Sequence, residues 1–581
     1  MTQQQDESTG SSHDDDPHFQ SMTQQEIQQY DMSSTSLSEQ DAAPLNESRT
    51  DETRDAAIQS PSKKDRLLVK LVFLILGIGF LLPWNAVVSA AAYFESRTCI
   101  SSLQNSAVAQ ENDDDGSSTS STKTSSNFML WFGLIYSFTG VITLGLRILY
   151  QQQHTKSNTI SNTAETEAKS RRVQKQIIIA SLSLFLFVML LTTALVLVPK
   201  LDPNFFQQVS LLSSAIFGIA GSFIGAGITS FANMFPPDIG ITPFISGQAI
   251  GGIVISLLNF ILFGVEQKGA DSFWNEKCRN SSFLKFDASI YLKDDAGGCE
   301  AYNIDFGAFA YFSAGSFFLV VCLVLYTHLE KSDIAEYYRL ESTRSDNIVV
   351  DGNDVTQDEE VSHAQQQDAE TDSLREPLLE STLEITTSNV EDSKASVVWK
   401  LIASPTISIF LTFMVTLTIF PSWATKMMSV NECKHRGNRL ENDLFIPGLI
   451  VIFNVFDFLG RTASGYIRIE TMNANKVLKI LAWMRFIFFP LCLLCQANGN
   501  RIVSTITLFL NDQWPILFMV LLAFTNGFVS TLSFIYAAIV MPKDDESQQI
   551  GSTILNFSLG LGCLFGSLTS FIYNYVGTGH W

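Results

Sequence analysis

An acidic and a basic residue stand one helical turn apart in an otherwise apolar stretch of this chain. Asp457 and Arg461 belong to the segment FNVFDFLGRTASGYI, which runs from Phe453 to Ile467. Residues four positions apart lie on the same face of a helix, so the two side chains can form an ion pair. Charges within the hydrocarbon of a bilayer are costly unless they are paired or hydrated, and such residues are therefore candidates for function.

Two hypotheses about this pair remain open from the residue types alone. In the first, the pair has a structural role and holds two helices together. In the second, Asp457 keeps the side chain of Arg461 extended, and the planar guanidinium offers several donors to a polar cargo. Asn454 lies one turn earlier on nearly the same face and would add an amide to such a site.

The sequence offers no groups for catalysis. It contains no phosphate-binding Walker loop, no HExxH zinc motif and no recognisable Ser-His-Asp constellation, and its cysteines and histidines show no metal-ligand spacing. We therefore predict a protein that is not an enzyme, with no catalytic residues, no metal site and no cofactor. The net charge of −21 also argues against nucleic acid as a partner, because phosphate contacts require clusters of Lys and Arg.

The charged pair lies in one of eleven apolar stretches, each long enough to cross a bilayer core of about 30 Å as a helix. We expect helices because lipid provides no hydrogen-bond partners for exposed backbone groups. The lipid bilayer is thus a predicted partner. The predicted spans are Leu67–Phe94, Phe128–Tyr150, Ile177–Val198, Val209–Met234, Thr242–Val265, Phe306–Thr327, Leu401–Ser422, Phe445–Ile467, Val477–Gln496, Trp514–Val540 and Ile550–Tyr575.

A long acidic tract divides the spans into six and five. The predicted fold class is accordingly an all-α polytopic membrane protein with a first bundle of six helices over 67–327 and a second bundle of five over 397–577. The tract 328–396 and the polar N-terminal tail 1–66 contain too few bulky apolar residues to form a core, so both are expected to be disordered and cytoplasmic. Residues 578–581 would then form a short extracellular C-terminus.

Positive residues near the first and third spans place the N-terminus in the cytoplasm and the loop after the fifth span outside. That loop contains a glycosylation sequon at Asn280, so we predict a glycoprotein. Cys278 and Cys299 flank the sequon, and either a disulfide between them or two free thiols would fit. We expect a multi-pass protein of the plasma membrane or of an endomembrane.

Glycines at intervals of four residues indicate where helices approach one another closely. Gly221 and Gly225 form one such pair, and Gly562 and Gly566 form another. Small residues at this spacing allow helix backbones to come into contact. We predict packing at these positions, and close packing at a gate is also what an alternating-access transporter needs.

Five stretches together resemble the equilibrative nucleoside transporter family. In chain order they are GIGFLLPWNAVVSAAAYF, PFISGQAIGGI, FNVFDFLGR, FTNGFVSTL and IGSTILNFSLGLG. They are similar to the family's first, fifth, eighth, tenth and eleventh helices. The resemblance extends over all eleven spans but not over the tails or the long central tract. It implies an eleven-helix bundle resembling the major facilitator architecture.

The resemblance implies transport of nucleosides, or of nucleobases, by alternating access, either facilitative or linked to protons. Arg461 and Asp457 would contact the ribose hydroxyls, and Gly247 would shape the fifth helix beside the path. We expect a monomer. The substrate-binding residues that the resemblance implies are Leu81, Trp84, Gln248, Asn454, Asp457 and Arg461.

One position departs from the family pattern. Gly225 aligns where many relatives carry a glutamine that contacts the base, so the preference for purines or pyrimidines is not predicted. Two alternative functions also remain: transport of another polar solute, such as a sugar, and a receptor or scaffold that does not transport. Arg485, another arginine within a predicted span, receives no role from the sequence.

Overall fold

The computed structural model describes residues 61–90, 93–94, 97, 128–157, 163–198, 201–265, 274, 278, 306–341, 394–435, 437–467, 474–497, 508–509 and 511–578. Within these residues the fold is helical, with one isolated β-bridge between Met427 and Ala497. The first half contains α2 (Lys63–Ser89), α4 (Phe128–Ser157), α5 (Thr163–Val196), α6 (Pro203–Asn233), α7 (Ile241–Val265) and α9 (Phe306–Glu330). The second half contains α13 (Lys394–Ile419), α14 (Phe445–Ser464), α15 (Ala474–Met484), α16 (Phe488–Leu493), α18 (Gln513–Val540) and α19 (Asp545–Thr578), with short 3₁₀ turns η3 (Ala424–Lys426), η4 (Arg439–Glu441) and η5 (Arg485–Ile487).

Ten of the helices in the described part of the chain are long and apolar enough to cross a membrane. They coincide with ten of the eleven predicted spans. The remaining stretch, Val477–Gln496, is not one regular helix, because α15 ends at Met484 and the 3₁₀ turn η5 separates it from α16. Pro490 accounts for this break: it has no N–H to donate to the residue 486 carbonyl, and its ring clashes with that carbonyl.

The predicted boundaries of the N-terminal tail and of the acidic tract are partly wrong. Ser62 caps α2, since its Oγ accepts from the Asp65 N–H at 3.3 Å while its own N–H donates to the Asp65 carboxylate at 3.1 Å. Residues 63–66 therefore belong to the first helix. Residues 333–341 are also helical, and the ring of Tyr338 packs 5.1 Å from that of Phe235. The apolar side chains of this segment explain why it folds; residues 342–393 lie outside the described part.

Close glycine contacts determine how several helices pack. A Cβ atom added to Gly247 on α7 would lie 2.1 Å from the Leu74 carbonyl oxygen on α2. One added to Gly460 on α14 would lie 2.1 Å from the Phe524 carbonyl oxygen on α18. At Gly562 and Gly566 on α19 the corresponding distances to backbone oxygens of α13 are 2.6 and 2.8 Å. The backbones of these three helix pairs are therefore in direct contact.

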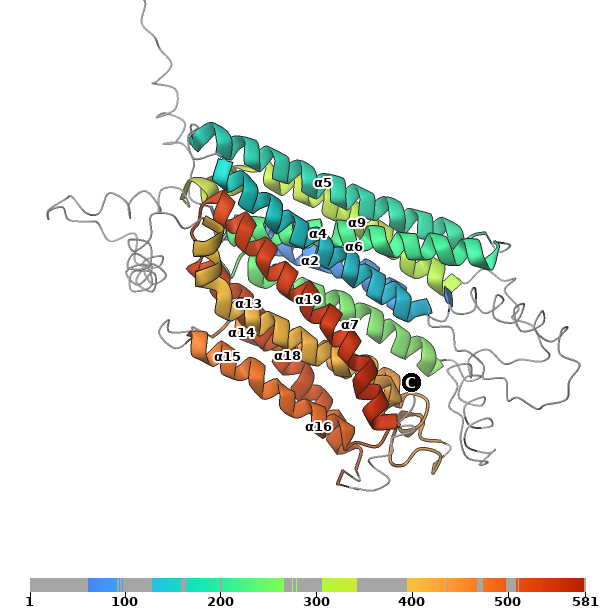
Figure 1. Ribbon diagram of the computed structural model, residues 1–581. Helices are drawn as coiled ribbons and strands as arrows, with labels where there is room; N and C mark the ends of the chain where they lie inside the picture. Colours follow the sequence, from blue (N-terminus) through green and yellow to red (C-terminus); the bar gives the residue numbers. More distant parts are fainter. Residues whose placement is uncertain are drawn as a thin grey trace, which may run out of the picture. The chain divides into compact units, whose positions relative to one another are not determined.

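The two halves of the chain meet through a few helices, which can be followed in Figure 1. Helix α14 of the second half packs on both α18 and α7, and α19 packs on α13 as well as on α4 and α6. Gly221 on α6 instead faces a side chain, since a Cβ there would lie 3.2 Å from the hydroxyl oxygen of Tyr136 on α4. Helix α14 thus carries the charged pair at the boundary between the halves.

Candidate functional site

Asp457 and Arg461 form a buried ion pair on α14. The Arg461 Nε donates to the Asp457 Oδ2 at 2.8 Å, and each side chain is only 7% exposed. Arg461 also reaches across to the first half, where its Nη1 donates to the Ile245 carbonyl oxygen of α7 at 3.2 Å. Removing one partner from such a pair would leave an uncompensated buried charge. The pair therefore links α14 to the first half of the chain, in addition to bridging one turn of α14 itself.

Asn526 on α18 completes the surroundings of Asp457 and was not singled out from the sequence. Its Nδ2 donates to the Asp457 Oδ1 at 2.7 Å, and the residue is 3% exposed. The close contact at Gly460 brings α18 near enough for this bond. The signal that could have revealed Asn526 is an amide next to a glycine inside an apolar helix, in the stretch FTNGFVSTL.

The hydrogen bonds continue from Asn526 to Arg485. The Asn526 Oδ1 accepts from the Thr416 Oγ1 of α13 at 2.7 Å, and the same Thr416 oxygen accepts from the Arg485 Nη2 at 2.6 Å. Arg485 is 1% exposed, and its Nη1 donates to the Leu522 carbonyl oxygen at 3.1 Å and to the Thr525 hydroxyl. Arg485 is therefore enclosed by protein, and it forms no ion pair with a carboxylate of the described residues.

Trp84 lies in an aromatic cluster of the first half. Its ring is 4.5 Å from that of Tyr136 and 6.2 Å from that of Phe132, both on α4. The space left between these rings is about the size of one water molecule, so the slot is closed in this structure. Tyr136 is a further member of the cluster that the sequence did not indicate, while Leu81 lies half-buried on α2, three residues before Trp84.

The other two predicted substrate-binding residues are Asn454 on α14 and Gln248 on α7, two helices that pack against each other. Asn454 on α14 donates from Nδ2 to the Ile450 carbonyl oxygen at 2.9 Å, and its Oδ1 lies 2.3 Å from where a Cβ of Gly252 on α7 would stand. Gln248 is half-buried on α7, three residues after Ile245. The α7–α14 boundary therefore carries the Asn454 amide as well as Arg461.

Gly225 faces side-chain ends rather than backbone. A Cβ added there would lie 3.0 Å from the Asn556 Oδ1 of α19 and 3.1 Å from the ring edge of Phe80. The Asn556 Nδ2 donates to the Ser552 carbonyl oxygen at 2.9 Å, which fixes the direction of its oxygen. Any side chain at position 225 must displace the ends of these two neighbours.

Neither alternative considered for Cys278, a disulfide with Cys299 or a free thiol, is found in the structure. Cys278 is bonded to Cys433, with a Cα–Cα distance of 5.2 Å and 155 residues between the partners. Spacing along the chain cannot reveal connectivity, and proximity favoured Cys299 only because both cysteines flank one sequon. Cys299 and the sequon residue Asn280 lie outside the described residues.

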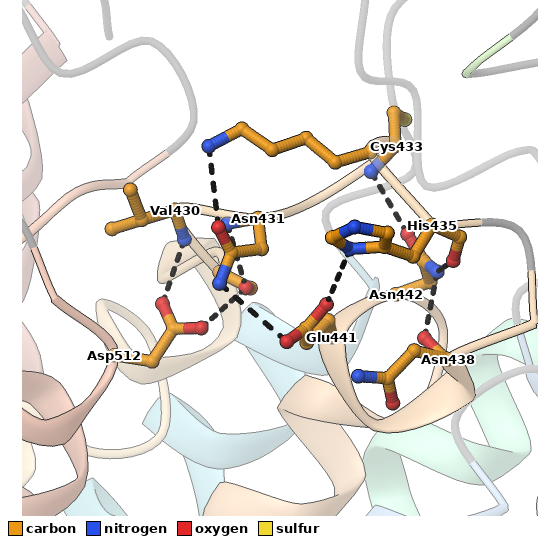
Figure 2. Close-up of polar contacts among 10 residues, drawn as sticks. Val430, Asn431, Cys433, His435, Asn438, Glu441, Asn442 and Asp512 are labelled. Carbon is orange, nitrogen blue, oxygen red and sulfur yellow. Dashed lines mark hydrogen bonds and ion pairs between the residues drawn. The ribbon is translucent and has the colours of Figure 1, made fainter.

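The loop between α13 and α14 that carries Cys433 is fixed by polar contacts, which Figure 2 shows. The carboxylate of Asp512 accepts from the Val430 N–H at 2.7 Å and from the Ser429 hydroxyl at 2.6 Å. The Asn442 Oδ1 accepts from the Cys433 N–H at 2.9 Å. The φ angle of Cys433 is 64°, in the left-handed region. These bonds hold the backbone of Cys433 in a conformation that most residues avoid.

Comparison with known proteins also indicates a membrane transporter. A family described as Nucleoside transporter matches residues 296–575. The chain is 26% identical to equilibrative nucleoside transporter 2 of Mus musculus, over 87% of this chain and 96% of the relative. It is 24% identical to equilibrative nucleoside transporter 1 of Homo sapiens, over 87% of this chain and 97% of the relative.

Among solved structures, the chain is similar to the major facilitator proton:xylose symporter XylE bound to 6-bromo-6-deoxy-D-glucose. The identity is 12% and the TM-score is 0.41, over 87% of each chain. The ten long apolar helices and the curated relatives make this a multi-pass membrane protein. The chain is therefore similar to equilibrative nucleoside transporters over most of its length, and the proteins that it matches are named as transporters.

Proposed function

We propose that this protein moves nucleosides, or nucleobases, across a membrane by alternating access, as a facilitative or a proton-linked transporter. The observation that carries the proposal is the position of Arg461. It extends from the second half to the α7 backbone of the first half while pairing with Asp457. Transporters built from two halves bind their cargo near mid-membrane where the halves meet. The names of the relatives supply the class of cargo.

The proposal includes an arrangement of six plus five spans in a monomer. Counting α15, η5 and α16 as a single interrupted span adds one crossing to the ten long helices. Six spans then precede the segment 342–393 and five follow it. The bundles 67–327 and 397–577 are the corresponding halves, with the N-terminus in the cytoplasm, in the plasma membrane or an endomembrane.

The residue chemistry suits a neutral, polar and partly flat molecule. A nucleoside has no net charge, so its recognition depends on directed hydrogen bonds. The Asp457 carboxylate has acceptors only and can accept hydrogen bonds from the ribose hydroxyls, while Arg461 and Asn454 offer donors. A base needs an apolar aromatic surface, which Trp84 and Tyr136 provide on the first half.

The test is uptake of labelled uridine or adenosine into proteoliposomes that contain the purified protein, preloaded with unlabelled nucleoside for counterflow. The proposal predicts accumulation that excess uridine abolishes and excess glucose does not. Competition by glucose with labelled glucose uptake would favour the sugar alternative, and no uptake of either would favour the receptor. An imposed pH gradient separates facilitative from proton-linked transport.

A matched pair of arginine variants makes the test specific. Arg461→Ala should abolish uptake, because it removes the donors and leaves Asp457 buried and unpaired, at a cost of about 3–5 kcal/mol. Arg439→Ala removes an arginine with the same spacing to an acid, since Arg439 pairs with Asp443 at 2.6 Å with 24% and 11% exposure. Uptake should survive in Arg439→Ala, and normal uptake by Arg461→Ala would contradict the binding role.

A further inference from the structure

Arg485 occupies an unusual place for a cation. It lies at the helix break between α15 and α16, 1% exposed, and its Nε has no hydrogen-bond partner. Its other donors serve two hydroxyls and a backbone carbonyl rather than an acid. Burying a guanidinium in this way is costly, and a structural role alone would be filled at lower cost by an apolar residue. The hydroxyls that accept from Arg485, those of Thr416 and Thr525, therefore point to its role.

The hydrogen bonds between Arg485 and Asp457 have one fixed direction. A guanidinium can only donate, so the Thr416 oxygen accepts from it at 2.6 Å. A carboxylate can only accept, so Asn526 must turn its Nδ2 toward Asp457, at 2.7 Å. The Asn526 Oδ1 consequently faces Thr416 and accepts from its hydroxyl at 2.7 Å, while the Thr412 carbonyl oxygen is a second acceptor of the same hydroxyl at 2.9 Å. Arg485 at one end and Asp457 at the other end thus both determine the orientation of the Asn526 amide.

Both carboxylate oxygens of Asp457 are held in place, Oδ1 through this chain of bonds and Oδ2 by Arg461, and acceptor sites remain available. Asn526 holds Oδ1 at 2.7 Å and Arg461 holds Oδ2 at 2.8 Å. A carboxylate has about four acceptor sites, so about two remain beyond these contacts for hydroxyl groups of a ligand. A pair of neighbouring hydroxyls, such as the 2′- and 3′-hydroxyls of a ribose, would need both oxygens held in place.

We propose that Arg485, acting through Thr416 and Asn526, is a positioning residue that orients the Asp457 carboxylate for the ribose hydroxyls. The inference rests on the proposed function. Arg485 itself does not contact the cargo, and its effect is confined to recognition of the sugar. Breaking the chain of bonds should therefore weaken binding of a nucleoside that has ribose hydroxyls and leave binding of a nucleoside without them unchanged.

The chain offers a matched pair of threonines for the test. Thr416→Val removes the hydroxyl between Arg485 and Asn526 and keeps the side-chain shape. Thr412→Val makes the same change one turn earlier on α13, at a buried hydroxyl that has no hydrogen-bond partner. Thr416→Ser restores the hydroxyl without the methyl group. Arg485→Lys keeps the charge but loses the planar fork that reaches several acceptors at once.

The measurement is the KM for uptake of uridine and of 2′,3′-dideoxyuridine in proteoliposomes, since KM does not depend on how much protein folds. In the wild type, uridine should have the lower KM. Thr416→Val and Arg485→Lys should raise the uridine KM roughly three- to tenfold, the effect of about one hydrogen bond, and leave the dideoxyuridine KM unchanged. Thr412→Val and Thr416→Ser should match the wild type.

Three outcomes would overturn the proposal, and they can be told apart. Equal increases of both KM values in Thr416→Val and Arg485→Lys would show a structural role only. A wild type that transports both nucleosides with the same KM would show that Asp457 does not read the ribose, while the proposed transport function stands. A wild type that transports neither nucleoside would overturn the proposed function and this inference together.

Discussion

Gly527 on α18 lies directly against Asp457 on α14: a Cβ atom added to the glycine would stand 2.0 Å from the Asp457 carbonyl oxygen. The contact is reciprocal with the one that Gly460 makes to α18. Both flank the charged pair, so the site is built where two helix backbones touch. Glycine is needed at 460 and 527 because a side chain would collide with the facing backbone, and not because the glycine adopts an unusual φ.

Gly527→Ala should therefore destabilise the protein. Inserting a methyl group between two backbones forces the helices apart, with a cost of roughly 1–3 kcal/mol or more, and it separates Asn526 from Asp457. The melting temperature of the purified protein in detergent should fall. Gly145→Ala is the control, since its nearest neighbour would be at an ordinary 3.5 Å from the new atom. Equal melting temperatures for the two variants would show that α14 and α18 are less tightly packed.

The double variant Asp457→Asn with Arg461→Gln distinguishes the structural hypothesis from the binding hypothesis. Both charges disappear while size and hydrogen-bonding groups are largely kept, so the helices should stay together. We expect normal expression and a monodisperse elution profile, but no uridine uptake above that of empty liposomes. Substantial uptake by this variant would assign the pair to helix packing alone.

The disulfide predicts a particular product on digestion. Mass spectrometry of the unreduced protein should detect a peptide pair that joins Cys278 to Cys433, and reduction should release the two peptides. Cys433→Ser should eliminate this pair, whereas Cys299→Ser should leave it intact. A cross-linked pair of Cys278 with Cys299 would instead support the connectivity expected from the sequence.

Gly225→Gln should change which bases the transporter prefers. The new amide would provide a donor and an acceptor next to the Asn556 oxygen and the Phe80 ring, which must move to make room. Competition of purine and pyrimidine nucleosides against labelled uridine should therefore give a narrower inhibition profile than the wild type. Gly225→Ala, which supplies no hydrogen-bonding group, is the control. An unchanged profile in folded Gly225→Gln would place this residue away from the cargo.

The sequence was sufficient to predict those features that depend on local composition. Ten spans follow from apolar length, and the pairing of Asp457 with Arg461 follows from their spacing on one helix face. Asn526, Thr416 and the Ile245 carbonyl could not be predicted, because each comes from a different helix. Only the packing of helices brings them together, and no local pattern in the sequence reveals that packing.

The missed disulfide and the missed break in the stretch Val477–Gln496 have different causes. The partner of Cys278 lies 155 residues away, in a loop that folds against Asp512, and no local pattern indicates that loop. The break at Arg485 could have been anticipated from Pro490, since a proline within a helix removes a backbone bond. The apolar composition of the stretch concealed it.

The cross-link between Cys278 and Cys433 also determines what happens when the chain is cut. The segment 342–393 lies between these two cysteines, so a protease that cleaves there produces one fragment with α2 to α9 and another with α13 to α19. The fragments remain covalently joined and migrate as one species on a denaturing gel until a reductant is added. A nicked protein therefore still consists of one covalent molecule, and separation of its halves requires reduction as well as proteolysis.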